Sequence, residues 1–345
     1  MKTVLCTLYN SLYLDKGLVL YDSLKECCPD YVLYVLCMDD RSYEVLSEIN
    51  VERIVLIRLA DFEKDIQSLN DAKQNRPFGE YCWTCTPFLI LYVIEKYKES
   101  ICTYIDADMY FYHDPQLLVN EMLDAGKSVM MVPHRFTSQN ESEAQKVGTY
   151  CVEFNVFKND PSGIEVLNHW CKQCLECCSN LGDGIHWGDQ KYMDEWPVAF
   201  TDQVHVCEHP GAGVAPWNLE WYRNYDLATN TVVYQKNEVT VPVVFYHFQS
   251  IAYFSRKKIN TNVASNNPSV DYQMVEQIYE PYLRHIDEKK QLISRRFGIN
   301  LLIKHHPSIT QDDRFKQWVR SFKLVRKVMC HIRPSWKHLP YIIYL

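Results

Sequence analysis

The stretch CTYIDADMYFYHDP, residues 102–115, places two carboxylates one residue apart at the end of an apolar run. The residues before Asp106 have the composition of a buried strand, and aromatic residues flank both acids. Asp106 and Asp108 are too close to be ionised together at low cost without a cation beside them. The pair therefore needs a partner, which is a metal ion, a lysine or water.

The residues before this stretch alternate between strand and helix patterns. Residues 3–10 and 31–38 are rich in leucine, β-branched and aromatic side chains, as buried strands are. Apolar residues at helical spacing lie between them, and a second helix pattern leads into the strand-like residues 53–59. This order predicts a parallel sheet with right-handed crossovers. Asp106 and Asp108 then lie at the carboxyl edge of the sheet, where open α/β sheets bind their ligands.

Further elements follow on both sides of the acidic pair. Thr86 and Pro87 are predicted to be the N-cap and first residue of a helix over 87–99. On a continuing strand, Asp106 and Asp108 would project to one side and Ala107 to the other. We also expect strands at 128–136, 148–160 and 241–250, a helix at 161–178 and a polar loop at 255–275.

These patterns predict an α/β fold, with a Rossmann-type mixed sheet flanked by helices and a basic helical C-terminal extension. The sequence shows no internal repeat and no low-complexity linker. We expect the sheet domain to span residues 1–255. Residues 256–284 would form a loop and connecting segment, and residues 285–345 a basic amphipathic helical tail.

Composition limits the classes of function. The chain has 345 residues, 47% hydrophobic and 23% charged, as ordinary globular proteins have. Its net charge is −7, but residues 301–345 alone carry nine Lys and Arg against two Asp. An acidic body of this kind argues against a broad nucleic-acid-binding surface, so no nucleic acid partner is expected.

Cysteine content and hydropathy indicate the compartment. The chain has 14 cysteines, but its N-terminus lacks the pattern of an export signal. The longest apolar run, residues 88–94, is too short to span a bilayer. Cys171, Cys174, Cys177 and Cys178 fall on one helix and wind around its axis, which favours structural thiols over a metal cluster. We therefore expect a cytoplasmic protein with reduced thiols.

The tail leaves two interpretations open. One helical stripe of apolar residues comprises Phe315, Trp318, Val319, Phe322, Val325, Met329 and Ile332, with lysine and arginine away from it. A basic amphipathic helix over residues 314–332 could lie peripherally on the anionic inner face of a membrane. It could equally pack on the acidic body with its lysines in water.

A hard divalent cation would resolve the repulsion between Asp106 and Asp108. Mg²⁺ and Mn²⁺ take oxygen ligands from one or two carboxylates and complete their shells with phosphates and water. A phosphatase of the haloacid-dehalogenase type also has two aspartates one residue apart. In those phosphatases the pair lies near the start of the domain. A Thr or Val follows two residues after the second aspartate, where this chain has Tyr110.

The motifs around the pair resemble those of glycosyltransferases with the GT-A fold. They are most similar to the family 8-like group, which includes glycogenin and bacterial lipopolysaccharide galactosyltransferases. The similar motifs are YIDADMYF (104–111), FNVFKND (154–160), GDQ (188–190), PWN (216–218) and FYHF (245–248). The resemblance covers about residues 1–255. Val156 and Phe157 replace the family's small residue and glycine, and residues 249–258 replace its glycine- and lysine-containing continuation.

This resemblance implies metal-dependent transfer of a sugar from a nucleotide diphosphate-sugar to a glycan or lipid-linked glycan. UDP is the favoured nucleotide, retention of anomeric configuration is favoured, and the product belongs to a surface polysaccharide or lipopolysaccharide. Asp106, Asp108 and His247 would hold Mn²⁺ or Mg²⁺. From the residues alone, His247 could also be a satisfied core histidine.

The resemblance and the strand order also assign candidate residues around the donor. Asp189 and Gln190 would stabilise the oxocarbenium-like sugar carbon. Asn155, His134 and Arg135 would line the sugar or acceptor side. The base and ribose would meet Thr7, Tyr9, Asn10 and Asp39 or Asp40, and the diphosphate would meet Lys257 or its neighbours Arg256 and Lys258.

Other functions remain open on the sequence. A nucleotide-sugar or glycan-binding protein without turnover would keep the same fold and metal site. An aspartyl-nucleophile phosphatase would release phosphate without sugar transfer. An inverting transferase would need a general base aimed at the acceptor hydroxyl, for which Asp189 or Glu153 could serve.

Overall fold

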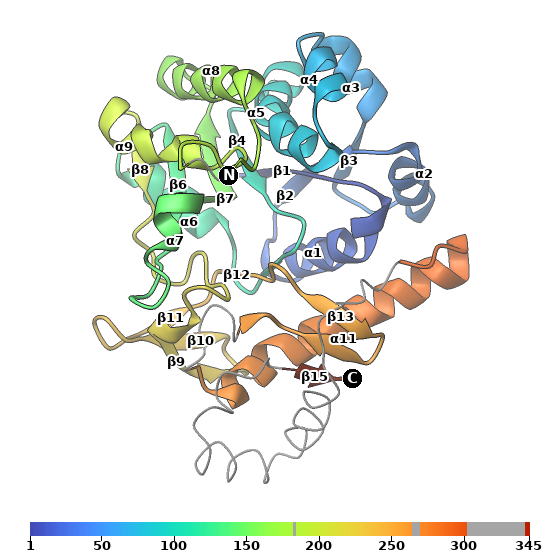
Figure 1. Cartoon of the computed structure of the whole chain (residues 1–345), viewed down its shortest axis with the longest axis vertical. Coiled ribbons are helices and arrows are strands. Elements are labelled where there is room, and N and C mark those ends of the chain that lie inside the picture. The colour runs from blue at the N-terminus through green and yellow to red at the C-terminus, as the bar shows by residue number, and fades with distance from the viewer. Residues whose placement is uncertain (182–183, 264–269, 302–341) are drawn as a thin grey trace.

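The computed structural model describes residues 1–181, 184–263, 270–301 and 342–345 (Figure 1). Its centre is a seven-stranded sheet in the order β3-β2-β1-β4-β7-β6-β8. The strands are β1 (Thr3–Tyr9), β2 (Tyr31–Cys37), β3 (Ile54–Arg58), β4 (Ile101–Ile105), β6 (Val129–Pro133), β7 (Tyr150–Lys158) and β8 (Val204–Val206).

The sheet is mixed, as expected. β1, β2, β3 and β4 run parallel, which confirms the predicted parallel arrangement. β7 is antiparallel to both β4 and β6, and β8 is parallel to β6. The α/β class with a mixed, helix-flanked sheet is therefore confirmed.

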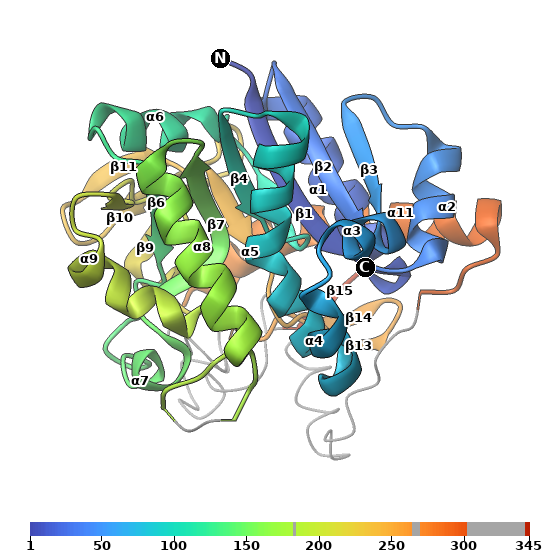
Figure 2. The same ribbon diagram turned by 90° about the horizontal axis from the view of Figure 1, so that it is seen from above.

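Helices cover both faces of this sheet. One face packs against α3 (Leu59–Asp65), α4 (Leu69–Asn75), α5 (Phe78–Tyr97) and α8 (Pro161–Glu176). The other packs against α1 (Leu14–Cys27), α2 (Asp40–Ile49) and α6 (Gln116–Asp124). Figure 2 shows α5 and α8 side by side over β4 and β7. Each face thus has its own apolar core, and the sheet lies between them.

The expected N-cap at Thr86 is wrong. α5 begins at Phe78, and Pro87 lies inside the helix. An internal proline costs a helix about 3 kcal/mol. The turns of α5 before Pro87 bury Tyr81 and Cys85 in the core beside α3. Burying a large side chain contributes about 1.5–3 kcal/mol to stability. Core burial therefore outweighs the local signal for a helix start.

Three smaller sheets lie beside the main one. β5 (Met109–Phe111) pairs with β12 (Phe245–His247). The others comprise β9 (Tyr222–Asp226), β10 (Thr231–Tyr234) and β11 (Val239–Pro242), and β13 (Ala252–Ser255), β14 (Lys258–Asn260) and β15 (Ile342–Tyr344). A short helix α7 (Glu143–Val147) and a single turn α9 (Trp196–Ala199) complete this half of the chain.

A long helix, α11 (Tyr272–Phe297), lies along α1 (Figure 1). It continues across residue 285, and His285 Nε2 lies 2.7 Å from Asp22 Oδ2 on α1. The polar stretch 255–275, expected as a loop, includes β14 and the start of α11, because Ile259 and Val275 are buried in a third core. The predicted tail helix over 314–332 lies outside the described residues.

Two further findings concern the cysteines and the hydropathy of the helices. Every cysteine within the described ranges is a free thiol. In the same ranges, no helix combines the length and the apolar character needed to cross a membrane.

Candidate active site

The two aspartates occupy the turn that joins β4 to β5. β4 ends at Ile105, so Asp106 and Asp108 lie at the carboxyl edge of a buried parallel strand, as predicted. The backbone N–H of Met109 donates to the carbonyl of Asp106 across 3.4 Å, which closes the turn. The two carboxylates face one side, as expected, although the strand ends at Ile105. The turn, and not strand periodicity, brings both carboxylates to one point.

His247 reaches these carboxylates through the pairing of β12 with β5. In that register His247 lies opposite Met109, and the Phe248 N–H donates to the Asp108 carbonyl at 2.9 Å. His247 Nε2 lies 3.1 Å from Asp108 Oδ1 and 3.7 Å from Asp106 Oδ2. The three residues that the resemblance assigned to a metal are thus neighbours in space.

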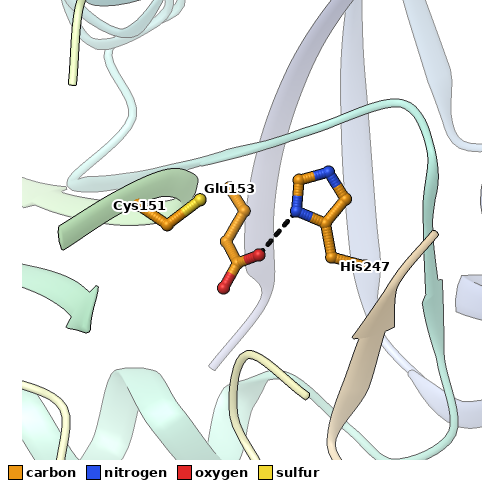
Figure 3. A group of neighbouring side chains, drawn as sticks. All are labelled: Cys151, Glu153 and His247. Carbon is orange, nitrogen blue, oxygen red and sulfur yellow. Dashed lines mark hydrogen bonds and ion pairs between the residues drawn. The ribbon is translucent and has the colours of Figure 1, made fainter. Parts of the chain in front are cut away.

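Glu153 on β7 fixes the imidazole from behind. His247 Nδ1 donates to Glu153 Oε2 at 2.6 Å, and Glu153 is 0% exposed (Figure 3). Gly213, with φ +69°, lies so close that a Cβ there would stand 2.6 Å from Glu153 Oε1. A carboxylate on one ring nitrogen orients a metal-binding histidine and raises its basicity. Glu153 therefore turns Nε2 towards the aspartates.

The electrostatics of this cluster give the two aspartates different pKa values. Burial raises the pKa of Asp106 to about 6, the His247 charge opposes that rise, and Asp108 adds to it. Burial also acts on Asp108, but the charge and hydrogen bond of His247 lower its pKa to about 2. Burial alone would lower the pKa of His247, yet Asp108 chiefly holds it well above the ordinary value. Without a metal, a protonated histidine thus serves as the cation.

The donor atoms fit a divalent metal ion. One oxygen each from Asp106 and Asp108 and Nε2 of His247 all lie within 4.8 Å of one another. The side chain of Asp106 is 30% exposed, so three protein ligands leave an open side for substrate oxygens. Cys151, Glu153 and His247 form a second possible group, but all three are buried and Nδ1 already contacts Glu153 (Figure 3). The open group is the better candidate.

Asp189 lies beside this group on the α5 side of the sheet. It is 5% exposed, and burial together with the charge of Asp106 raises its pKa to about 7, against a hydrogen bond from Thr86. Tyr104 donates its hydroxyl to Asp106 Oδ1 at 3.1 Å. Asp189 and Asp106 therefore belong to one continuous acidic cluster.

The loop that carries Asp189 rests on α5. Gly188 has φ +56°, and a Cβ there would meet the Trp83 ring at 3.3 Å. Trp170 donates its indole N–H to the Asp189 carbonyl at 2.8 Å, which fixes the backbone. Gln190 is turned away, because its Nε2 donates to the Val147 carbonyl at 2.7 Å.

The other residues expected on the sugar side have structural contacts. Asn155 is fully buried and donates Nδ2 to the Val152 carbonyl at 2.8 Å. His134 stacks on Phe136 and meets Trp217, whose ring in turn lies edge-on to His247 at 5.5 Å. Arg135 donates to three backbone carbonyls of the loop 207–212. These residues shape the wall around His247.

Some of the residues expected near the nucleotide are buried in the core, and the others lie at the carboxyl edge of the sheet, which we call the rim. Thr7 and Tyr9 are buried within the sheet core. Asn10 and Asp39 lie at the ends of β1 and β2, where Asn10 Oδ1 accepts from Leu12 N–H. Asp39 accepts from the N–H groups of Ser11 and Ser42 and caps α2, which Asp40 begins. The structure therefore brings only Asn10 and the Asp39–Asp40 pair to the rim.

The cations expected at the diphosphate lie on the β13–β14 hairpin. Arg256 forms a bidentate ion pair with Asp287 on α11, at 2.7 and 3.0 Å. Lys257 is exposed in the hairpin turn. Sequence reasoning gave Glu153 only as a possible base, and it missed Thr86 and Tyr104 as members of the cluster. The sequence signal that could have identified Glu153 as a partner of the site is an acidic residue within the pattern of a buried strand.

We expect Glu153→Gln to weaken Mn²⁺ binding about 10- to 100-fold, the usual effect of losing an oriented histidine partner. Titration of the purified protein with Mn²⁺, followed by the paramagnetic signal of free Mn²⁺, would measure it. Glu143→Gln on exposed α7 is the matched control. Equal Mn²⁺ affinity in both variants would contradict the orienting role of Glu153.

Metal affinity should rise with pH. Binding requires His247, whose pKa is raised, to lose its proton, and Asp106 with a pKa of about 6 to be ionised. Each proton released contributes up to about tenfold per pH unit, so we expect a steep increase over the range above about pH 5.5, where Asp106 begins to ionise. Calorimetry in buffers of different ionisation enthalpy would count the protons. A Mn²⁺ dissociation constant that is flat over this range would exclude His247 as a ligand.

The chain was compared with known proteins at the levels of sequence and structure. No protein-family model matches it. Among solved structures it is similar to the galactosyltransferase LgtC in complex with donor and acceptor sugar analogues (14% identity, TM-score 0.48, covering 72% of this chain and 87% of that one). It is also similar to mouse xyloside xylosyltransferase 1 (13%, TM-score 0.47, 72% and 98%). Both TM-scores are below 0.5, so the function is argued from the site alone.

Two curated proteins of Bacillus subtilis (strain 168) are more similar in sequence. The uncharacterized protein YfnF is 27% identical over 303 residues, covering 86% of this chain and 97% of its own length. The uncharacterized protein YfnD is 30% identical over 289 residues, covering 82% of this chain and 89% of its own. The chain belongs to the same family as YfnD.

Proposed function

We propose that this protein is a metal-dependent glycosyltransferase. It moves a sugar from a nucleotide diphosphate-sugar, with UDP favoured, to a glycan or lipid-linked glycan acceptor. The observation that carries the proposal is the meeting of Asp106, Asp108 and His247 Nε2 at the carboxyl edge of the sheet. Open α/β sheets bind nucleotides at that edge.

Asp106, Asp108 and His247 are the residues that would hold Mn²⁺ or Mg²⁺. When bound, the ion supplies Lewis-acid stabilisation of the negative charge on the diphosphate leaving group. Glu153 keeps Nε2 of His247 directed at that position through its bond to Nδ1. Asn10 and Asp39 stand at the ends of β1 and β2, where a base and ribose at this edge would lie.

The chain's second contribution concerns the sugar carbon. Breaking the sugar–phosphate bond leaves the electron pair on the diphosphate and positive charge on that carbon. Asp189 is a nearly buried carboxyl in the same acidic cluster as Asp106, and its ionised form would stabilise such a charge. Burial strengthens the effect, because little water screens it.

The structure narrows the candidates for a general base. An inverting transfer needs a base that reaches the acceptor hydroxyl. Glu153 is fully buried and bonded to His247, so it lacks that access. Asp189 alone of the two acids considered lies beside the open group. We propose a retaining transfer in which Asp189 stabilises the sugar carbon. The anomeric configuration of the product would test this proposal.

The decisive experiment measures release of nucleoside diphosphate from a panel of UDP-, GDP- and dTDP-sugars, with Mn²⁺ and with EDTA. We expect slow hydrolysis of one donor that depends on Mn²⁺ and stops in EDTA, because water replaces the absent acceptor. Mn²⁺-dependent nucleotide binding without release, even with glycan acceptors present, would favour a binding protein. Release of inorganic phosphate from an added phosphomonoester, without any sugar transfer, would favour the phosphatase.

Asp108→Asn should reduce donor hydrolysis by about 10²–10³-fold, equivalent to about 3–4 kcal/mol of lost transition-state stabilisation. The variant keeps the side chain's shape but removes the charge that pairs with His247. Asp124→Asn, at the exposed end of α6, is the control. A rate and Mn²⁺ dependence like those of the wild type would refute the metal site.

A further inference from the structure

The donor diphosphate needs a cation from the protein, and the expected hairpin does not offer a clear one. Arg256 is held by both oxygens of Asp287. Lys290 on α11 is also engaged, because its Nζ lies 3.5 Å from Asp15 Oδ2 and 3.6 Å from the centre of the Tyr253 ring. Lys257 projects from an exposed turn. Within the described part of the chain, a further cation near the acidic pair comes from another element.

That cation is Lys16, in the first turn of α1. This turn is pressed against the end of β1, because a Cβ on Gly17 would stand 2.3 Å from the Tyr9 ring. β1 pairs directly with β4, and β4 leads into the acidic turn. The first turn of α1 therefore borders the same sheet edge as Asp106 and Asp108.

The surroundings of Lys16 suit a bound anion. Its side chain is half-buried, with Nζ 3.7 Å from the centre of the Tyr13 ring. Among the described residues, no carboxylate forms an ion pair with this ammonium group, unlike that of Lys290. Burial would lower the pKa of Lys16, but the charges of Asp108, Tyr13 and Asp15 raise it, so the group stays protonated. A half-buried charge without an ion-pair partner is stabilised by a ligand of opposite charge.

We propose that Lys16 is a donor-binding residue whose ammonium group contacts the diphosphate of the nucleotide-sugar. The assignment rests on the proposed function, because it supposes a nucleoside diphosphate held at Asp106 and Asp108. Lys16 and the metal ligands would then neutralise the diphosphate from two sides.

The assignment makes two predictions of opposite sign. In Lys16→Gln, we expect UDP and inorganic pyrophosphate to bind about 10- to 100-fold more weakly in the presence of Mn²⁺, as for loss of a charged hydrogen bond. Mn²⁺ alone should bind as well as, or better than, to the wild type, because a positive charge near Asp108 has been removed. A structural lysine would instead weaken both.

The experiment is calorimetric titration of the full chain with Mn²⁺ alone, then with UDP, GDP, dTDP, uridine and pyrophosphate at saturating Mn²⁺. Lys16→Arg should restore most of the diphosphate affinity, and Lys25→Gln, exposed in the last turn of α1, is the matched control. Unchanged UDP and pyrophosphate binding in Lys16→Gln overturns the assignment, as does a parallel loss of Mn²⁺ affinity. Failure of the wild type to bind any nucleoside diphosphate would instead contradict the proposed function itself.

Discussion

The hydrogen bond between Glu153 and His247 is the interaction on which the candidate site depends. It joins β7 of the main sheet to β12 of the small one, and both side chains are buried. Breaking a buried charged pair by removing one partner typically costs about 3–5 kcal/mol, because the other charge is left uncompensated. The pairing of β12 with β5 brings the same histidine to Asp108. Rigid strands thus hold His247 on both sides, which favours a preformed metal site over one assembled on binding.

Charge balance explains how this acidic edge can exist without a ligand. His247 lies between Asp108 and Glu153 and compensates both. The raised pKa values of Asp106 and Asp189 show that the rest of the cluster resists full ionisation. A divalent cation would replace the histidine proton and permit that ionisation. Lys16 adds a positive charge at the rim, where an anionic donor would approach. The proposed site would therefore hold a cation and an anion together.

Much of the fold follows from local patterns in the chain. The strands β1, β2 and β4 were predicted within a residue or two, because their apolar runs are buried on both sides. The helix predicted at 161–178 is α8, Pro161–Glu176, which Asp160 caps. The start of α5 was missed because Pro87 and Thr86 give a strong local signal that core packing overrides. The polar stretch 255–275 concealed β14, whose partner β15 is distant in sequence.

The choice of His247 as companion of the acids came from the resemblance of its motif to a known family. The sequence by itself determined the α/β order and the position of Asp106 and Asp108 after a buried strand. These are local properties, set by hydrophobic period and residue chemistry. Only the tertiary structure showed that a turn, and not strand alternation, brings the two carboxylates together. It also showed that Glu153 orients His247 and that Arg256 is paired with Asp287. It also placed the first turn of α1, which carries Lys16, at the same edge of the sheet. Such contacts join segments up to 139 residues apart, as between His247 and Asp108, and no local pattern encodes which side chains meet across strands.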